Sequence, residues 1–161
     1  MGETMNPMFL YRTNVVQSPQ RGPHMQLDPA AFLADPELVH ALEIRATPIP
    51  CDEDRVLFRQ GDPPIGLFIL LNGEATLSMV SENGEPIIIT QASAGSLLGL
   101  PGLIANQPYS LTAIARRGAR VSFIARSDFN ALMQSDLPLL LLTLQVLASE
   151  VRSARIAITQ Q

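Results

Sequence analysis

The sequence of 161 residues contains no lysine and no tryptophan, one cysteine and two histidines. The single cysteine, Cys51, cannot form an internal disulfide, which favours a reducing, cytoplasmic location. One cysteine also excludes an ordinary iron–sulfur cluster, which takes about four cysteine ligands. A metal site inside a β-barrel takes several histidines and a carboxylate, and this chain offers only His24 and His40. We therefore expect no metal site and no cofactor.

Positive charge is also scarce. All eleven basic residues are arginines, and the formal net charge is −4. Because phosphate neutralisation needs clustered basic side chains, a nucleic-acid-binding surface across the whole chain is excluded. Three arginines, Arg116, Arg117 and Arg120, flank a tight turn and either bind an anion or form a solvated hairpin tip.

Signals for export or for a membrane are missing. The N-terminus has no basic start followed by an apolar run, so no signal peptide is expected. The most apolar segment, Leu137 to Leu147, is interrupted by polar residues and is too short to span a bilayer. We expect a cytoplasmic protein that does not bind membranes.

Motifs for catalysis are missing as well. The chain has no Gly-x-Ser-x-Gly nucleophile elbow and no phosphate-binding P-loop. Ser110 and Tyr109 have no base indicated by the sequence. With 47% apolar and 16% charged residues, the composition is that of a globular domain. We therefore expect a folded domain that is not an enzyme.

The first part of the chain, residues 1–27, shows no periodicity and is expected to form a flexible N-terminal arm. Two Asp-Pro steps follow, at Asp28-Pro29 and Asp35-Pro36. Each places a good N-cap before a proline at the first helical position. Two short helices are therefore expected, ending near Arg45.

Between residues 48 and 126, short runs of β-forming residues alternate with turn signals. Asn83-Gly84 between two such runs predicts a hairpin with a type I′ turn, whose two central residues both need positive φ. Many short strands at this spacing predict a β-barrel or jelly roll. The expected fold class is mainly β with flanking helices.

The last part of the chain has a helical pattern. Asp128 is expected to cap a short helix that reads DFNALM, and a longer amphipathic helix is expected over residues 137–161. In the longer helix, apolar residues step 4, 3, 4, 3, 4, the spacing that keeps one stripe facing a partner helix. This predicted seam consists of Leu140, Leu144, Leu147, Val151, Ala154 and Ile158.

The seam predicts a homodimer. The alternative is a helix packed on its own barrel, for which further apolar side chains are available at Leu139, Leu141, Leu142 and Val146. Both arrangements can hold together, with the first turns against the barrel and the seam against a second copy.

Two segments resemble a known domain family. The first, LFRQGDPPIGLFILLNGEA from Leu57 to Ala75, has the Gly-Asp turn, the apolar run and the later glycine of the family's opening roll. The second, LGLPGLIANQPYSLTAIA from Leu98 to Ala115, lines up with the family's phosphate-binding cassette. The chain thus resembles the cyclic nucleotide-binding domains of catabolite-activator-type regulators. The resemblance implies a double-stranded β-helix, or jelly-roll β-roll, with its preceding helices over residues 28–136 and a C-terminal dimerisation helix over residues 137–161.

The cassette keeps its backbone pattern here but not its charged side chains. The resemblance places Leu100 where the family has the glutamate that accepts the ribose 2′-hydroxyl. It places Tyr109 where the family has the arginine that pairs with the cyclic phosphate, and Leu111 where it has a small alanine. The candidate ligand-binding residues of this degenerate cassette are Gly99, Leu100, Gly102, Leu103, Tyr109, Ser110 and Leu111. Burying a phosphate diester without a charged partner costs several kcal/mol, so binding of cyclic AMP or cyclic GMP in the usual way is not expected.

Three states of the pocket are compatible with the sequence: a roll filled by its own side chains, a pocket for an apolar or weakly anionic small molecule, and residual cyclic nucleotide binding. We expect the first, and with it a stand-alone regulatory or interaction module. The alternatives are a small-molecule sensor with a rebuilt pocket and the sensor half of a transcription regulator. In such regulators a winged helix-turn-helix follows the long helix, whereas this sequence ends at Gln161, so direct DNA binding is not expected.

Overall fold

The computed structural model describes residues 26–160. The arm predicted for residues 1–27 therefore lies almost entirely outside the described residues. Its last residue, Leu27, is buried, and its carbonyl oxygen accepts a hydrogen bond of 3.0 Å from the Thr90 hydroxyl. Leu27 thus belongs to the folded domain.

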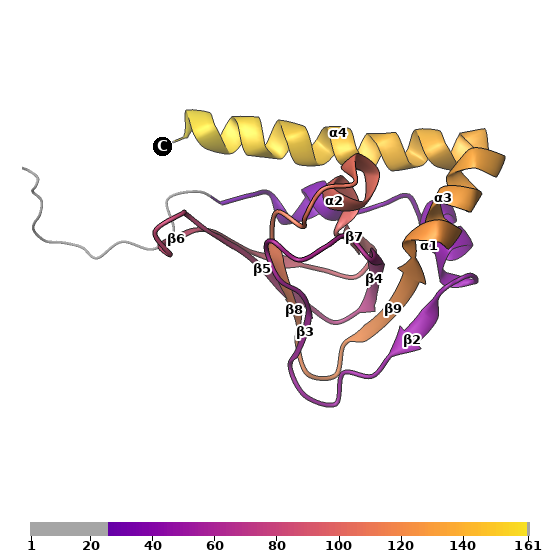
Figure 1. The fold of residues 1–161 in the computed structure, drawn as a ribbon, viewed down its shortest axis with the longest axis horizontal. Helices are drawn as coiled ribbons and strands as arrows, with labels where there is room; N and C mark the ends of the chain where they lie inside the picture. Colours follow the sequence, from indigo (N-terminus) through magenta and orange to yellow (C-terminus); the bar gives the residue numbers. More distant parts are fainter. Residues whose placement is uncertain (1–25, 161) are drawn as a thin grey trace, which may run out of the picture.

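Two four-stranded antiparallel sheets form the body of the molecule. The first contains, in spatial order, β2 (Thr47–Ile49), β9 (Arg120–Ala125), β4 (Gly66–Asn72) and β7 (Ser96–Leu98). The second contains β3 (Arg55–Phe58), β8 (Thr112–Ala115), β5 (Ala75–Val80) and β6 (Pro86–Ala92). The strands curve around one another as a roll (Figure 1). The predicted jelly-roll-like fold is confirmed.

Strand β4 separates two hydrophobic cores. Its first five residues are all buried, and their side chains alternate between the two faces, as they must in a strand. Phe68 and Leu70 belong to the core inside the roll. Leu67 and Ile69 belong to a second core, beneath the helices. Because both faces of β4 are covered along most of its length, its sequence is apolar from Leu67 to Leu71, and only the exposed Asn72 at its end is polar.

In the described part of the chain, the helical segments are η1 (Pro29–Phe32), α1 (Pro36–Glu43), α2 (Leu100–Ala105), α3 (Arg126–Ser135) and α4 (Leu137–Thr159). The two helices predicted at the Asp-Pro steps are confirmed, the first as a 3-10 turn. Asp28 and Asp35 cap them, because each side chain accepts a backbone N–H from two residues further on, at 2.9 and 2.8 Å.

Two local predictions are wrong in detail. Helix α3 begins at Arg126, so Asp128 lies in its first turn and not at the cap. In the first turn, its negative charge still interacts favourably with the helix dipole. At the β5–β6 hairpin, Gly84 has a positive φ of 85° but Asn83 does not, so the turn is not of type I′. The hairpin is closed instead by a longer loop, in which the Ser81 N–H donates to the Glu85 carbonyl at 2.8 Å. The additional residues remove the constraint of a two-residue turn.

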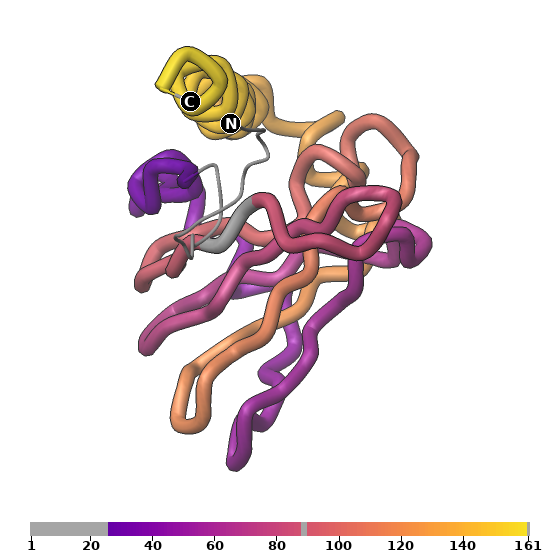
Figure 2. Tube along the Cα trace, turned by 90° about the vertical axis from the view of Figure 1, so that its left-hand side faces the viewer, coloured from indigo at the N-terminus to yellow at the C-terminus, as the bar shows by residue number. Residues whose placement is uncertain are grey.

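Helix α4 runs along one side of the roll, above α2 and η1 (Figure 1), and Figure 2 views it nearly end-on. Asp136 caps it by accepting the Leu139 N–H at 3.1 Å. The buried residues of α4 form one stripe toward the body and are Leu139, Thr143, Val146, Ser153 and Ala157. By length and composition, α4 is the one helix in residues 26–160 that could cross a membrane, a test that core helices of soluble proteins also meet.

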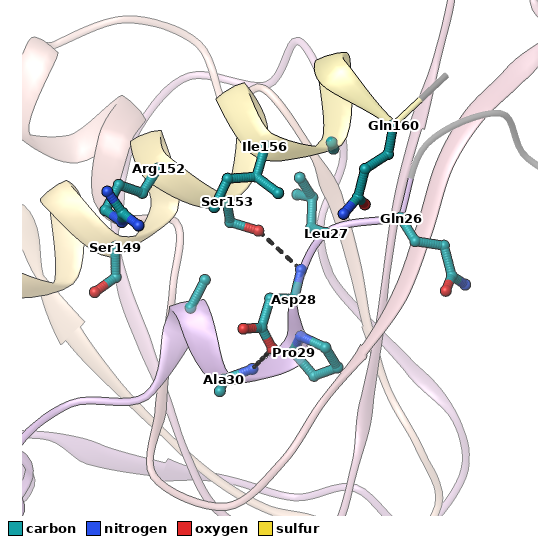
Figure 3. Close-up of a pocket in the computed structure, with 12 residues that line it drawn as sticks. Gln26, Leu27, Asp28, Pro29, Ala30, Ser149, Arg152, Ser153, Ile156 and Gln160 are labelled. Atoms are coloured by element: carbon teal, nitrogen blue, oxygen red, sulfur yellow. Dashed lines mark hydrogen bonds between the residues drawn. The ribbon is translucent and has the colours of Figure 1, made fainter.

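The second half of α4 is tied to the chain just before η1. The Asp28 N–H donates to Ser153 Oγ at 2.8 Å (Figure 3). The Asp28 carboxylate also accepts the Ala30 N–H, so one residue both caps η1 and binds α4. An open groove beside this contact is lined in part by Arg152 and Gln160.

Candidate functional site

The cassette predicted from the sequence connects β7 to β8 and includes α2. Gly99 caps α2 in a left-handed conformation with φ 96°, and Asn106 ends the helix in the same region with φ 54°. A Cβ atom on Gly99 would lie 2.8 Å from the Tyr109 ring, closer than atoms can pack. Glycine is thus required both for the turn and for the approach of Tyr109.

Tyr109 is held inside the roll by its backbone and by its hydroxyl group. Its N–H donates to the Asp62 carbonyl at 2.9 Å, and its carbonyl accepts the Gly61 N–H at 2.8 Å. The phenolic O–H donates to the Gly66 carbonyl at 2.6 Å and accepts the Gly66 N–H at 3.1 Å. Tyr109 therefore bridges the cassette to the first residue of β4.

The Tyr109 ring is only 2% exposed and stacks on Phe58, with 4.1 Å between the ring centroids. Burial raises the pKa of the phenol, and the hydrogen bond to Gly66 opposes that rise only in part. The phenol therefore stays neutral at physiological pH. At the position where the family resemblance expects an arginine, the structure has a neutral ring whose O–H is already bonded to the backbone.

Five of the seven predicted site residues meet at one small cavity: Gly99, Gly102, Tyr109, Ser110 and Leu111. Leu100 and Leu103 do not line it and are instead fully buried in the second core. Successive residues of a helix differ in direction by about 100°, so one face of α2 turns toward the roll interior and the other toward the second core.

The cavity beside Tyr109 is nearly filled. Its volume is about 20 Å³, which is room for one water molecule. Pockets for small molecules typically measure about 300–1,000 Å³. Besides the five predicted residues, its walls are Phe32, Phe58, Leu77, Leu98, Pro101 and Glu150.

Glu150 is the one formally charged residue among those that line this cavity. Its Oε2 atom is buried and has no hydrogen-bond partner in the described part of the chain. Burial raises the pKa of this carboxyl to about 8, because the ionised form loses its hydration and gains no partner. Glu150 is not among the residues predicted from the sequence, although it continues the spacing of the buried residues Thr143 and Val146.

The predicted seam lies beside the stripe of α4 that packs on the body. Leu140 and Leu147 are partly buried against the second core. Leu144, Val151 and Ile158 are 46%, 49% and 59% exposed. The exposed apolar face of α4 comprises these three residues with Leu137, Leu141 and Ala154. Among residues 26–160, nothing covers this face.

Around the β8–β9 turn, the side chains of Arg116 and Arg120 and the backbone of Arg117 contact acidic side chains of the same domain. Arg116 Nε lies 3.5 Å from Asp54 Oδ2, and a terminal nitrogen of Arg120 lies 3.5 Å from Glu43 Oε2. The Arg117 N–H donates to Asp54 at 2.7 Å. These contacts favour the solvated hairpin tip over an anion site. In the described residues, no group of His, Cys, Asp and Glu is arranged to hold a metal ion.

Replacing Tyr109 with phenylalanine removes the hydroxyl that pairs with both backbone groups of Gly66. We expect the free energy of unfolding to fall by about 1–3 kcal/mol, because a buried N–H and a buried carbonyl lose their partner. The neighbouring exposed residue supplies the control, and Ser110→Ala should change that free energy by less than about 0.5 kcal/mol. Urea denaturation followed by circular dichroism measures both variants. Equal stability of Tyr109→Phe and the wild type would contradict the bridging role.

Replacing Glu150 with glutamine keeps the shape of the side chain but removes its ionisation. In the unfolded wild type this carboxyl ionises near pH 4.5, whereas in the folded protein it keeps its proton up to about pH 8. Glu150 therefore leaves the free energy of unfolding unreduced below pH 4.5. As the pH rises from 4.5 to about 8, that free energy falls by up to about 1.4 kcal/mol per pH unit.

Glu150→Gln should not show this loss, so its advantage over the wild type in free energy of unfolding should grow from about pH 5 to about pH 8. Glu82→Gln, at the exposed tip of the β5–β6 hairpin, should follow the wild type. Denaturation at several pH values measures all three proteins. Parallel profiles for the wild type and Glu150→Gln would mean that water reaches the carboxyl.

The chain matches the family model described as the cyclic nucleotide-binding domain over residues 49–136. Among curated proteins, no match is found. Among solved structures, the catabolite activator protein of Thermus thermophilus aligns with a TM-score of 0.66 and 23% identity, over 83% of this chain and 62% of that one. A transcriptional regulator from Thermotoga maritima aligns with a TM-score of 0.64 and 22% identity, over 74% of this chain and 94% of that one. The sensor domain of the transcriptional regulator DNR from Pseudomonas aeruginosa aligns with a TM-score of 0.58 and 20% identity, over 76% of this chain and 81% of that one.

At these identities the structural likeness supports the fold alone. The chain spans less than two thirds of the length of the Thermus protein. The family match covers more than half of the chain and includes the strands β3 to β9 with the cassette between them. With the two sheets, the cassette and the long helix in the order expected, the chain belongs to the cyclic nucleotide-binding domain family.

Proposed function

We propose that this domain is a regulatory or interaction module in which Tyr109 closes the cassette to cyclic nucleotides and α4 joins two copies of the chain. The observation that carries the proposal is the position of the Tyr109 side chain, buried and bonded to both backbone groups of Gly66. In this proposal the domain acts by offering its surface, including α4, to a second copy or another partner, and it catalyses no reaction.

Electrostatics support the closure. A cyclic nucleotide carries a phosphate diester, which needs charge-assisted hydrogen bonds once it leaves water. Among residues 26–160, no arginine lines the cavity, and its one carboxyl, on Glu150, keeps its proton up to about pH 8 and so supplies no positive charge to an anion. A ligand of that size would also have to displace the Tyr109 ring from Phe58 and from Gly66. Closure thus has both a steric and an electrostatic cause.

The contacts of α4 support a fixed geometry. Glu150 of α4 lines the same cavity as the cassette, and Ser153 binds the backbone of Asp28. In a sensor of this family, pocket occupancy is expected to shift the short helix and the long helix together. Here the Tyr109 side chain leaves a volume of only about 20 Å³, so we propose that α2 and α4 keep one relative position.

The exposed apolar face of α4 supports pairing of two chains. The helix is 23 residues long, and successive members of this face lie 4, 3, 7, 3 and 4 residues apart, so they follow one side of the helix. Apolar surface that is continuous along a helix is typical of an interface. We propose a cytoplasmic homodimer joined along this face.

A second candidate function is the sensor part of a DNA-binding regulator. It is supported by the likeness to the DNR sensor domain and by the greater length of the Thermus protein. The mass of the native protein, measured by mass spectrometry of the cells that make it, distinguishes the two functions. A native chain that continues into a DNA-binding domain would favour the second candidate.

Titration calorimetry with cyclic AMP and cyclic GMP tests the closure. We expect no saturable heat at nucleotide concentrations up to the millimolar range, because residues 26–160 provide neither the space nor a cationic partner at the cavity. Non-cyclic AMP serves as the control for weak, unspecific heats. A dissociation constant in the micromolar range for either cyclic nucleotide would overturn the closure.

Leu144→Arg tests the pairing, because it places a charge within the exposed apolar face and leaves the buried stripe of α4 unchanged. Light scattering should give the mass of a dimer for the wild type and that of a monomer for this variant. Gln145→Arg adds the same charge at the next exposed, polar position and should stay dimeric. A monomeric wild type, or a dimeric Leu144→Arg, would contradict pairing through this face.

A further inference from the structure

One buried polar group has no role in the closure by Tyr109. The Oε2 atom of Glu150 is shielded from solvent and has no hydrogen-bond partner among residues 26–160, and Glu150 lines the cavity between α4 and the cassette. A buried carboxylate without a partner is costly, and a buried carboxylic acid leaves acceptor capacity unused. The cavity therefore contains an acceptor for a group that the described part of the chain does not supply.

The walls around this acceptor suit a cation. Three aromatic rings line the cavity, those of Phe32, Phe58 and Tyr109. Aromatic faces attract ammonium groups, and the attraction strengthens when the cation is removed from water. Rings combined with a carboxylate favour a cation and oppose an anion, the reverse of the cyclic nucleotide chemistry expected from the family.

Within residues 26–160, no other charged residue lines the cavity with Glu150. From the elements packed against it, namely η1, β3, β5, β7 and the cassette, Tyr109 is the one other titratable residue that lines the space. On α4 itself the nearest charged residues, Arg152 and Arg155, are exposed. An incoming ammonium group would thus meet a single counter-ion.

The size of the cavity limits the ligand. A volume of about 20 Å³ admits a group of the size of one water molecule, and a primary ammonium head has that size. The cavity is not sealed on every side, because Ser110 is exposed and Leu111 and Pro101 are partly exposed. A short alkyl chain attached to the head can therefore lie between these residues while the head reaches Glu150.

We propose that the space between α4 and the cassette binds the protonated head of a small primary alkylamine, with the Glu150 carboxylate as its counter-ion. This inference deepens the proposed function and rests on it for the exclusion of cyclic nucleotides. Binding converts Glu150 from the acid to the carboxylate, and its proton goes to the buffer while the amine keeps its own. Below about pH 8, each binding event therefore releases up to one proton, and affinity weakens by up to tenfold per pH unit as the pH falls.

Titration calorimetry with propylammonium chloride tests the proposal, with 1-propanol and sodium propionate as the neutral and anionic probes of similar size. Saturable binding of propylammonium to the wild type is expected, at least tenfold tighter than that of either other probe. Glu150→Gln should weaken it at least tenfold, and Glu82→Gln at the exposed hairpin tip should leave it unchanged. Equal binding of the three probes, no saturable binding of propylammonium, or equal binding by Glu150→Gln would overturn the proposal.

A second measurement needs no variant. Titration of the wild type with propylammonium at pH 7 in buffers of different ionisation enthalpy gives the number of protons released. A value near one is expected, and a value of zero would overturn the role of Glu150. The cyclic nucleotide titrations keep the two proposals distinguishable. If neither the amine nor the nucleotides bind, this inference fails and the closure stands, whereas nucleotide binding defeats the closure itself.

Discussion

The hydroxyl group of Tyr109 joins two parts of the chain that lie 43 residues apart. It donates to the carbonyl and accepts from the N–H of one residue, Gly66, where a Cβ atom would lie 2.4 Å from the Ile124 carbonyl oxygen. The stacking on Phe58 and the small volume left beside α4 depend on the Tyr109 side chain staying in place, and its ring leaves no room for a Cβ atom on Gly99. A phenol forms these two hydrogen bonds without carrying a charge, whereas a buried arginine at the same position would need an anion as its partner.

Signals that act over a few residues predict this fold well. The Asp-Pro steps specify η1 and α1 because the cap and the proline act within one turn of helix. Helix α4 is predicted as a helix, but the sequence does not determine which of its faces meets the roll. Leu139, Thr143 and Val146 have the same spacing as Leu140, Leu144 and Leu147, and a rotation of about 100° exchanges the two sets. The shape of the roll, which only tertiary structure supplies, decides between them.

For the candidate site as well, local patterns predict one part and tertiary structure determines the rest. The cassette's glycines and the replacement at Tyr109 are visible in the sequence, because the family pattern is contiguous there. That pattern predicts Leu100 as a pocket residue, but the orientation of α2 places its side chain in the second core. Glu150 reaches the cavity from α4 and lies 39 positions after Leu111, the last cassette residue at the cavity, so no local pattern could associate it with the site. A lone acid within an apolar helical stretch was the single available signal.

The hydrogen bond from Asp28 to Ser153 spans 125 positions of the sequence. Helix α4 is synthesised after the whole roll, and until it docks, the second core lacks the side chains of Leu139 and Val146. Leu38, Leu42 and Phe129, fully buried in the finished domain, then have no cover from that side. A chain in which α4 has not docked thus exposes part of this apolar surface, and transiently exposed apolar surface promotes aggregation.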